Sequence, residues 1–240
     1  RTMLRSELKN SPVPVYMIFH GINPKEQPKF EKQARKVEPY QQIHLKIITL
    51  RNDFKKSGLK NVDLIVPPVF KPWELPVDKH LSFKPPIKIG FFGQFRKEKN
   101  LGFFLEAFTK AEFSVPVELI VQGATAKPED GELFEKFAKD YSQYSNISFL
   151  HQNLIGVEWQ KALLGVDAIM MPYAAERYRY HWGAMLFTAI GFYKPVLQSP
   201  ELNPEVLQQF NVGKAIDLSS VEAFSRQLEE FIEDLVKNTA

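Results

Sequence analysis

Three basic side chains stand between an apolar run and an amphipathic run in residues 90–108, GFFGQFRKEKNLGFFLEAF. The apolar run ends at Gly93, and Arg96, Lys97 and Lys99 follow it. The free N–H groups at the start of a helix attract anions, and basic side chains in the preceding loop add to that attraction. Arginine can hold a phosphate through two hydrogen bonds, and lysine adds a point charge. The stretch therefore predicts an anion-binding loop, although a loop that merely improves solubility has the same pattern.

A second candidate loop, AAERYRYHW at residues 174–182, is rich in arginine and tyrosine. Its cationic side chains can bind a phosphate, and its tyrosines can stack on a base or a sugar. A surface loop packed by its own aromatic side chains is the alternative. The candidate residues of this loop are Glu176, Arg177, Tyr178, Arg179, Tyr180 and His181.

A third candidate is His20, which with the next glycine ends the apolar run of residues 14–21. The alternative for His20 is a ring that packs at the end of a strand. Three other histidines lack the spacing of metal ligands and are interpreted as structural: His44, His80 and His151. The sequence has no cysteine, which excludes disulfides, thiolate metal sites and a cysteine nucleophile. We expect no bound metal.

The elements that position these loops alternate between strand and helix patterns after residue 86. The predicted strands are 87–93, 117–123, 146–152, 167–173, 194–199 and 212–218. The predicted helices are 101–111, 130–144, 157–166, 181–193 and 219–238, the last with an N-cap at Ser219-Ser220 and support from Glu222. Such alternation predicts a parallel sheet covered on both faces. Ligands of these sheets bind beyond the carboxyl ends of the strands, which directs attention to the loops after Gly93, Gly123, Gln152 and Tyr173.

The first part of the chain is less regular, with three predicted strands and little helix. These strands are 14–21, 43–50 and 62–69. Frequent proline in residues 68–86 indicates an extended connector. We therefore expect a partial N-terminal domain and linker at residues 1–85 and a C-terminal domain at residues 86–240. The first residues do not resemble the natural beginning of a protein, so we expect the first domain to be the tail of a larger α/β domain.

Charge is distributed unevenly between these two parts. Residues 1–86 hold 16 Lys and Arg against 8 Asp and Glu, whereas the remainder holds 15 against 20. A basic first part can meet an anionic membrane surface or an anionic substrate, and a lysine-rich solvated face is the alternative. No apolar run approaches the roughly 20 residues that span a bilayer. We expect a cytoplasmic protein, either free or peripheral at the inner face of the membrane.

Four segments together resemble retaining GT-B glycosyltransferases of the family 4-like type. IGFFGQFRKEKNLGFFLEAF resembles the opening of their C-terminal domain, and VELIVQG, VDAIMMPY and WGAMLFTAIGFYKPVLQS resemble its later elements. LKNVDLIVPPVF resembles the end of their N-terminal domain and the linker. The resemblance covers about residues 87–235. It implies an α/β, GT-B-like fold: a Rossmann-like parallel sheet in the C-terminal domain and a partial α/β N-terminal domain.

The same resemblance implies roles for individual residues. Arg96 and Lys99 would hold the diphosphate of a nucleotide sugar, and the amides of Trp182, Gly183 and Ala184 would cap it. Two glutamates of the family align with Tyr180 and Thr188, at the positions that contact the donor sugar and the ribose. Glu176 can substitute for the first, Arg177 and Arg179 can bind the donor, and His20 would lie near the acceptor. His20 and Glu176 are thus the candidate catalytic residues.

The resemblance further implies transfer of a sugar from a UDP- or GDP-linked donor to a glycan or lipid-linked acceptor, in surface polysaccharide synthesis. The nucleotide sugar would be a co-substrate, with no metal or other cofactor and no nucleic-acid partner. The absence of both glutamates leaves an alternative open: a catalytically inactive relative that acts as a binding partner or nucleotide-sugar sensor.

Overall fold

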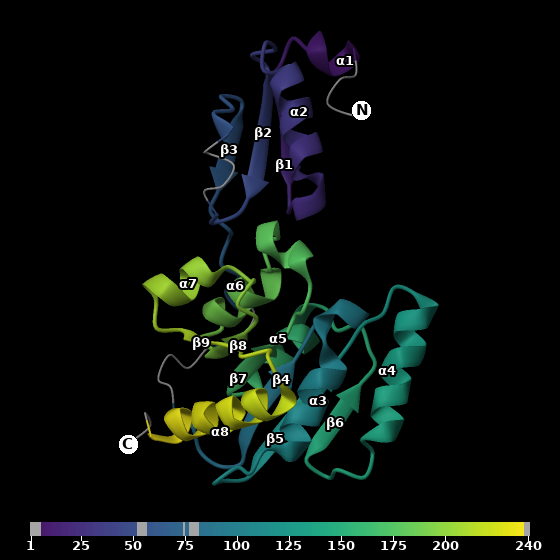
Figure 1. The fold of residues 1–240 in the computed structure, drawn as a ribbon, viewed down its shortest axis with the longest axis vertical. Coiled ribbons are helices and arrows are strands. Elements are labelled where there is room, and N and C mark those ends of the chain that lie inside the picture. The colour runs from purple at the N-terminus through teal and green to yellow at the C-terminus, as the bar shows by residue number, and fades with distance from the viewer. Residues whose placement is uncertain (1–5, 52–56, 74, 77–81, 238–240) are drawn as a thin grey trace. The chain divides into compact units, whose positions relative to one another are not determined.

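A computed structural model describes residues 6–51, 57–73, 75–76 and 82–237 (Figure 1). The chain forms two compact units. The first unit comprises Arg1–Pro68, Ala175–Ala184 and Glu201–Gln208, and the second comprises Val69–Ala174, Met185–Pro200 and Gln209–Ala240. The boundary expected between residues 85 and 86 stays a prediction. Two short segments from the later half of the chain are thus built into the first unit.

The first unit contains a three-stranded parallel sheet in the order β1-β2-β3. Its strands are β1 (Val15–Phe19), β2 (Ile43–Ile48) and β3 (Val62–Ile65), preceded by α1 (Ser6–Lys9). The helix α2 (Gln27–Val37) connects β1 to β2. Buried side chains of β2 and α2 make its core: Ile43, Leu45, Ile47, Phe30, Ala34 and Val37.

The prediction of little helix in this unit was wrong, because α2 has eleven residues. Its buried face consists of Phe30, Ala34 and Val37, at the i, i+4 and i+7 positions of a helix. Charged and glutamine side chains fill most other positions, which hides so narrow an apolar stripe. Pro28 lies in the first turn, where its missing N–H would have no partner within the helix.

The second unit is a six-stranded sheet in the order β6-β5-β4-β7-β8-β9, with every neighbouring pair parallel. The strands are β4 (Ile87–Phe91), β5 (Val117–Gln122), β6 (Ile147–Leu150), β7 (Ala168–Met171), β8 (Val196–Gln198) and β9 (Gly213–Ala215). The predicted parallel α/β sheet is confirmed. Chain order reverses between β4 and β7, and the carboxyl ends beside such a switch point are where ligands of open α/β sheets bind.

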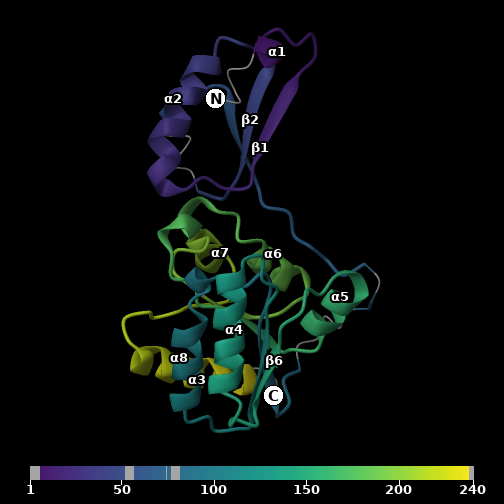
Figure 2. The ribbon, with the colours of Figure 1, turned by 90° about the vertical axis from the view of Figure 1, so that its right-hand side faces the viewer.

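Helices lie on both faces of this sheet. Figures 1 and 2 show α3 (Leu101–Lys110), α4 (Pro128–Asp140) and α8 (Val221–Lys237) on one face and α5 (Gly156–Leu164) on the other. The chain also forms α6 (Ala184–Gly191) and α7 (Pro204–Gln209). Among the described residues, no helix has the length and apolar character needed to cross a membrane.

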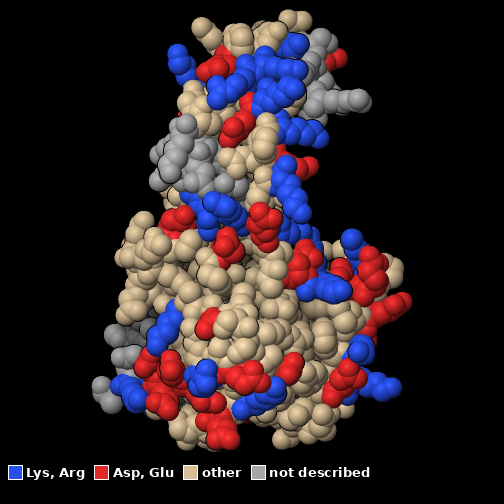
Figure 3. All heavy atoms as spheres, viewed as in Figure 1, with Lys and Arg blue, Asp and Glu red and all other residues tan. Residues whose placement is uncertain are grey.

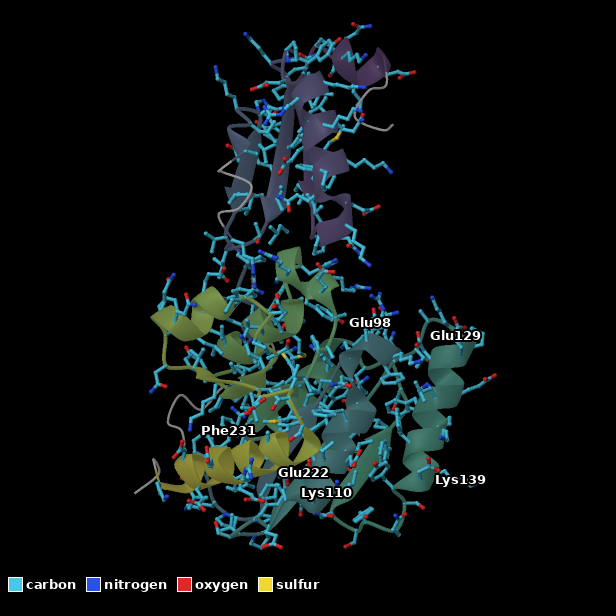
Figure 4. The ribbon with its side chains drawn as sticks, viewed as in Figure 1. Glu98, Lys110, Glu129, Lys139, Glu222 and Phe231 are labelled. Atoms are coloured by element: carbon cyan, nitrogen blue, oxygen red, sulfur yellow. The ribbon has the colours of Figure 1, made fainter. Side chains whose placement is uncertain are left out.

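The start of α8 is fixed by a side-chain cap and by an ion pair to α3. The Ser220 hydroxyl accepts a hydrogen bond from the Ala223 N–H at 3.0 Å, which confirms the predicted N-cap. Lys110 of α3 lies 3.1 Å from Glu222 of α8, and Figure 4 shows these two labelled side chains near each other. Both groups are exposed, so the pair adds little stability and mainly marks where the two helices meet.

Side-chain charge on the first unit is dominated by cations on the face drawn in Figure 3. Lysines and arginines crowd this part of the surface, in agreement with the 16 basic and 8 acidic residues within residues 1–86. The predicted excess of positive charge in the first part of the chain is therefore visible on this face of the first unit.

Aromatic rings hold α3 and α8 against the sheet. Phe104 is fully buried, and its ring centroid lies 6.4 Å from that of Phe91 in β4 and 5.7 Å from that of Phe224 in α8. We expect Phe104→Ala to lower the free energy of unfolding by about 3–5 kcal/mol, because it opens a large cavity between these layers. Denaturant titration followed by circular dichroism measures the change.

Phe210→Ala is the control for this substitution, because the Phe210 side chain is exposed. It should change the free energy of unfolding by no more than about 0.5 kcal/mol. Equal effects of the two substitutions would contradict the described packing of α3.

Candidate functional site

One buried side chain, Gln122, connects the ends of three neighbouring strands. It is the last residue of β5, and its Oε1 accepts a hydrogen bond from the Gly93 N–H at 2.9 Å, just after β4. Its Nε2 donates to the Gln152 carbonyl at 2.5 Å, just after β6. A glutamine suits this place because one amide both donates and accepts. The loops after β4, β5 and β6 are thereby held together.

Backbone hydrogen bonds extend this connection between the loops. The Phe95 N–H donates to the Ala124 carbonyl at 2.6 Å, and the Ala124 N–H donates to the Gly93 carbonyl at 3.3 Å. The Gly123 N–H donates to the Leu150 carbonyl of β6 at 3.1 Å. The loops that follow β4, β5 and β6 are therefore hydrogen-bonded to one another at the carboxyl edge of the sheet.

A hollow of about 750 Å³ opens at these loops, within the size range of small-molecule sites. Its lining combines small residues, amides and one indole. The lining residues are Gly93, Gln94, Gln122, Ala124, Thr125, Ala126, His151, Gln152, Asn153, Leu154, Ile155, Gly156 and Trp159. Trp159 of α5 is held against the ring of Phe92, with 6.0 Å between the ring centroids. Of the four loops to which the sequence directs attention, those after Gly93, Gly123 and Gln152 line this hollow, whereas the loop after Tyr173 is not part of its lining.

Lys99 lies at the switch point of the sheet. Its ammonium donates a hydrogen bond to the Phe92 carbonyl after β4 at 3.2 Å and lies 5.0 Å from the ring centroid of Tyr173 after β7. The Ala174 N–H also donates to the Glu98 carbonyl at 3.0 Å, which joins the loop after β7 to the turn that carries Lys99. The ammonium is therefore positioned by the ends of both β4 and β7.

Gly93 suits its position mainly because of its backbone conformation. Its φ of +101° is a conformation that residues with a side chain rarely adopt. In addition, a Cβ built there would lie 3.3 Å from the Lys99 Nζ, and Gly93 itself lines the hollow. Because Gly93 has no side chain, the Lys99 ammonium can lie directly beside the part of the hollow that Gly93 lines.

Burial shifts the pKa of Lys99 strongly. Although part of its side chain reaches solvent, the ammonium is packed among protein atoms, and its pKa falls from the ordinary 10.5 to about 7, chiefly because of this desolvation. The positive charge of Arg96 contributes to this lowering, and the negative charge of Glu98 opposes it. A lysine with this pKa is only partly protonated near neutral pH. It binds an anion well when the negative charge of the anion raises its pKa, so that the amine takes up a proton.

Arg96 lies at the entrance to the same turn. Its Nη2 donates to the Gln94 Oε1 at 3.2 Å, and Gln94 lines the hollow. The turn Lys97–Lys99 is a short 3-10 helix, which Asn100 ends in a left-handed conformation with φ of 58°. Asparagine tolerates that conformation better than most residues, so the chain can pass directly from the basic turn into α3.

The arginine-rich loop forms a short 3-10 helix, Glu176–Tyr180, in the first unit. Tyr178 is buried, and the Arg177 guanidinium lies 5.4 Å from its ring centroid. Glu176 and Arg179 are exposed, and the side chain of Tyr180 lies outside the described part of the structure. The loop is thus partly packed by its aromatic side chains, and the predicted donor contacts of its members stay predictions.

The first unit brings His20 and the end of this loop together. The ring centroids of His20 and Trp182 are 5.5 Å apart, and Gly21 forms an antiparallel bridge with His181. A Cβ at Gly21 would lie 2.7 Å from the His181 ring, so only glycine permits this approach. The catalytic roles expected of His20 and Glu176 stay predictions.

The segment before α6 is held by Asn203, whose Nδ2 donates to the Trp182 carbonyl at 2.6 Å. Gly183 has φ of +67°, and α6 begins at Ala184. Thr188, expected to contact the ribose, is buried in α6. Residues 182–184 belong to the first unit, whereas Arg96 and Lys99 belong to the second, and their joint role at one diphosphate stays a prediction.

The sequence pointed to the loops of the hollow but not to most of the side chains that line it. The sequence-based interpretation of His151 as structural misses that His151 lines the hollow together with Thr125 and hydrogen-bonds to it. The available signal was position, because His151 directly follows β6 at the carboxyl edge of the sheet. His80 lies outside the described residues. Within the part of the chain that is described, no group of three or more metal-binding side chains is assembled.

The architecture of this chain is similar to that of solved glycosyltransferase structures. No family model matches the sequence, and no curated protein matches it. Among solved structures, HepE of Anabaena, in complex with UDP, superposes with a TM-score of 0.65 at 13% identity, over 94% of this chain and 64% of HepE. The lipopolysaccharide outer core galactosyltransferase WaaB gives a TM-score of 0.59 at 13% identity, over 95% of this chain and 69% of WaaB.

The C-terminal domain of LpcC, a group 1 glycosyl transferase from Francisella tularensis, gives a TM-score of 0.52 at 20% identity. The match covers 71% of this chain and 90% of that domain. The chain has the GT-B fold. At these identities the likeness concerns the fold, and this GT-B chain spans less than two thirds of the length of HepE.

We expect Gln122→Met to lower the free energy of unfolding by about 2–4 kcal/mol. Methionine fills a similar volume but leaves the Gly93 N–H and the Gln152 carbonyl without their buried partner. Denaturant titration measures the loss, and amide exchange at Gly93 should become faster. The exposed Gln143→Met is the matched control and should be nearly neutral. A neutral Gln122→Met would show that the three loops do not depend on this amide.

We expect Lys99→Met to stabilise the free protein below pH 7. In the wild type, the buried ammonium lowers the free energy of unfolding below pH 7. The reason is that the pKa of Lys99 is about 7 in the folded protein and the ordinary 10.5 in the unfolded chain, so the unfolded chain holds this proton more tightly. As the pH rises from 7 toward 10, this destabilisation disappears and the advantage of the variant should shrink. Thermal denaturation at several pH values measures the difference, with the exposed Lys97→Met as control. A pH-independent difference would contradict the buried ammonium.

Proposed function

We propose that the second unit binds the nucleotide sugar of a glycosyltransferase reaction. The observation that carries this proposal is the placement of Lys99 at the β4–β7 switch point, beside the Gly93 wall of the hollow. In this proposal the hollow holds the nucleoside, and Lys99 and Arg96 hold the diphosphate. The HepE structure in complex with UDP supports the choice of a nucleoside diphosphate as the ligand class.

The chemistry follows from the charge that develops during transfer. When the bond between the sugar and the diphosphate breaks, the electron pair stays on the diphosphate, which gains negative charge. Cations fixed beside it interact more strongly with that state than with the bound donor, and only such a difference accelerates the reaction. Lys99 is suited to this role because the diphosphate restores its proton, and the desolvated ammonium then faces a strong partner.

For the acceptor we propose a glycan or a lipid-linked glycan, in surface polysaccharide synthesis. The proposal draws support from the GT-B resemblance and from WaaB, a lipopolysaccharide galactosyltransferase with the same fold. The cationic surface of the first unit is compatible with an anionic acceptor or with a membrane surface. A cytoplasmic site of action belongs to the same proposal.

We expect Arg96→Ala to lower UDP affinity at least tenfold and donor turnover by roughly 100-fold, because a charge-assisted contact to the leaving group is lost. Calorimetric titration with UDP and GDP measures affinity, and hydrolysis of a UDP-sugar by the intact protein measures turnover. The exposed Arg226→Ala of α8 is the matched control and should leave both unchanged. Turnover of Arg96→Ala within threefold of wild type would remove Arg96 from the site.

The same titration tests Lys99 through pH. Between pH 7.5 and 8.5, the phosphates of UDP are ionised and its uracil ring keeps its N–H, while free Lys99 is mostly neutral, so diphosphate binding at Lys99 must take up a proton. Wild-type affinity should therefore fall as the pH rises, whereas Lys99→Met should bind weakly and lose this slope. Strong binding without turnover of any nucleotide sugar would favour the alternative of a nucleotide-sugar sensor.

A further inference from the structure

A chain of hydrogen bonds, Thr125–His151–Glu135, forms one wall of the hollow. The Thr125 hydroxyl lies 2.9 Å from the His151 Nε2, and the His151 Nδ1 contacts the Glu135 Oε1. Thr125 and His151 line the hollow, whereas Glu135 stands behind them on α4 and is exposed. Neither the resemblance nor the proposed diphosphate contacts assign a role to these three side chains.

Helix α4 holds this chain in place. Phe134 packs on the His151 ring, with 4.8 Å between the ring centroids. Gly131 faces the pair as well, because a Cβ built there would lie 3.4 Å from the Thr125 Oγ1 and 3.7 Å from the His151 Cε1. Gly131, Phe134 and Glu135 are spaced i, i+3 and i+4, so they occupy one face of the helix. The imidazole is thus clamped between α4 and the loop that carries Thr125.

The order of donors and acceptors along the chain follows from Glu135. An ionised carboxylate only accepts hydrogen bonds, so the His151 Nδ1 must carry a hydrogen. In the neutral imidazole, Nε2 is then an acceptor, and the Thr125 hydroxyl is the group that donates to it. In this neutral tautomer the hydroxyl hydrogen is committed to His151, and the Thr125 oxygen offers only its lone pairs to a ligand in the hollow.

We propose that Glu135, acting through His151, makes Thr125 an acceptor that selects a nucleobase with a ring N–H. Uracil and guanine carry such a donor, whereas cytosine and adenine present a bare nitrogen at the corresponding ring position. This inference rests on the proposed binding of a nucleoside diphosphate in the hollow. Thr125 is then a specificity-determining residue, and His151 and Glu135 are positioning residues.

The first test reads the imidazole directly and needs no ligand. In the free protein labelled with ¹⁵N-histidine, long-range proton–nitrogen spectra should show His151 with Nδ1 protonated and Nε2 bare at pH 8. Glu135→Gln should populate the other tautomer, because a neutral amide can donate to Nδ1. The exposed Glu132→Gln on the same helix is the matched control and should leave the wild-type tautomer. A wild-type His151 with the hydrogen on Nε2 would overturn the proposal.

The second test measures selection as the ratio of UDP affinity to CDP affinity. Wild type should favour UDP at least tenfold, and Glu135→Gln should reduce this ratio about fivefold, as expected for one hydrogen bond. Thr125→Val should bring the ratio close to one, whereas Thr125→Ser keeps the hydroxyl and should preserve it. A general loss of packing would weaken both nucleotides alike and leave the ratio unchanged.

The outcomes separate this inference from the function on which it rests. If wild type binds UDP but Thr125→Val and Glu135→Gln leave the ratio at its wild-type value, selection by Thr125 is wrong and the donor site stands. If wild type binds no nucleoside diphosphate, the proposed function is wrong and the selection falls with it. A reduced ratio in both variants, with Thr125→Ser and Glu132→Gln unchanged, supports the proposal.

Discussion

The two hydrogen bonds of the buried Gln122 amide are the constraint on which the candidate site depends. Parallel strands are not joined by hairpins, so nothing in their covalent connection brings the loops after β4, β5 and β6 together. The Gln122 side chain does so by accepting from Gly93 and donating to Gln152. A carboxylate there could not donate and an alkyl chain could do neither, so an amide suits this place, and the backbone hydrogen bonds between the loops add to its effect.

Lys99 shows the conflict between stability and function at the same edge. Its ammonium is held by the Phe92 carbonyl and the Tyr173 ring, which desolvate it without supplying a full negative charge. Folding therefore retains a group whose charged form is destabilising, and the proposed diphosphate would offset that cost. Gly93 adds to this arrangement, since its missing side chain keeps the wall open beside the ammonium.

The sequence predicted the second unit well because its signals are local. Short apolar strands alternate with amphipathic helices, and the basic residues Arg96 and Lys99 fall in a loop that any parallel sheet would place at its carboxyl edge. Helix α2 was missed because its stripe of Phe30, Ala34 and Val37 is narrow among charged neighbours.

The side-chain contacts within the hollow were missed for a different physical reason. The decisive contacts of the hollow join residues far apart in sequence, such as the Gln122 side chain with the Gln152 carbonyl and the Thr125 hydroxyl with the His151 ring. No periodicity or local spacing encodes such pairs, and a lone histidine looks the same in a core as in a ligand site. Strand order, which brings β5 between β4 and β6, is also absent from any local pattern.

The left-handed Asn100 has a consequence for the entropy of binding. It separates Lys99 from Leu101, a buried residue at the start of α3, by a single position. A flexible loop that closes on an anion must give up backbone freedom worth about 1–2 kcal/mol for each residue it orders. Here that freedom is already lost when α3 packs, so the proposed diphosphate would not have to order the backbone that carries Lys99.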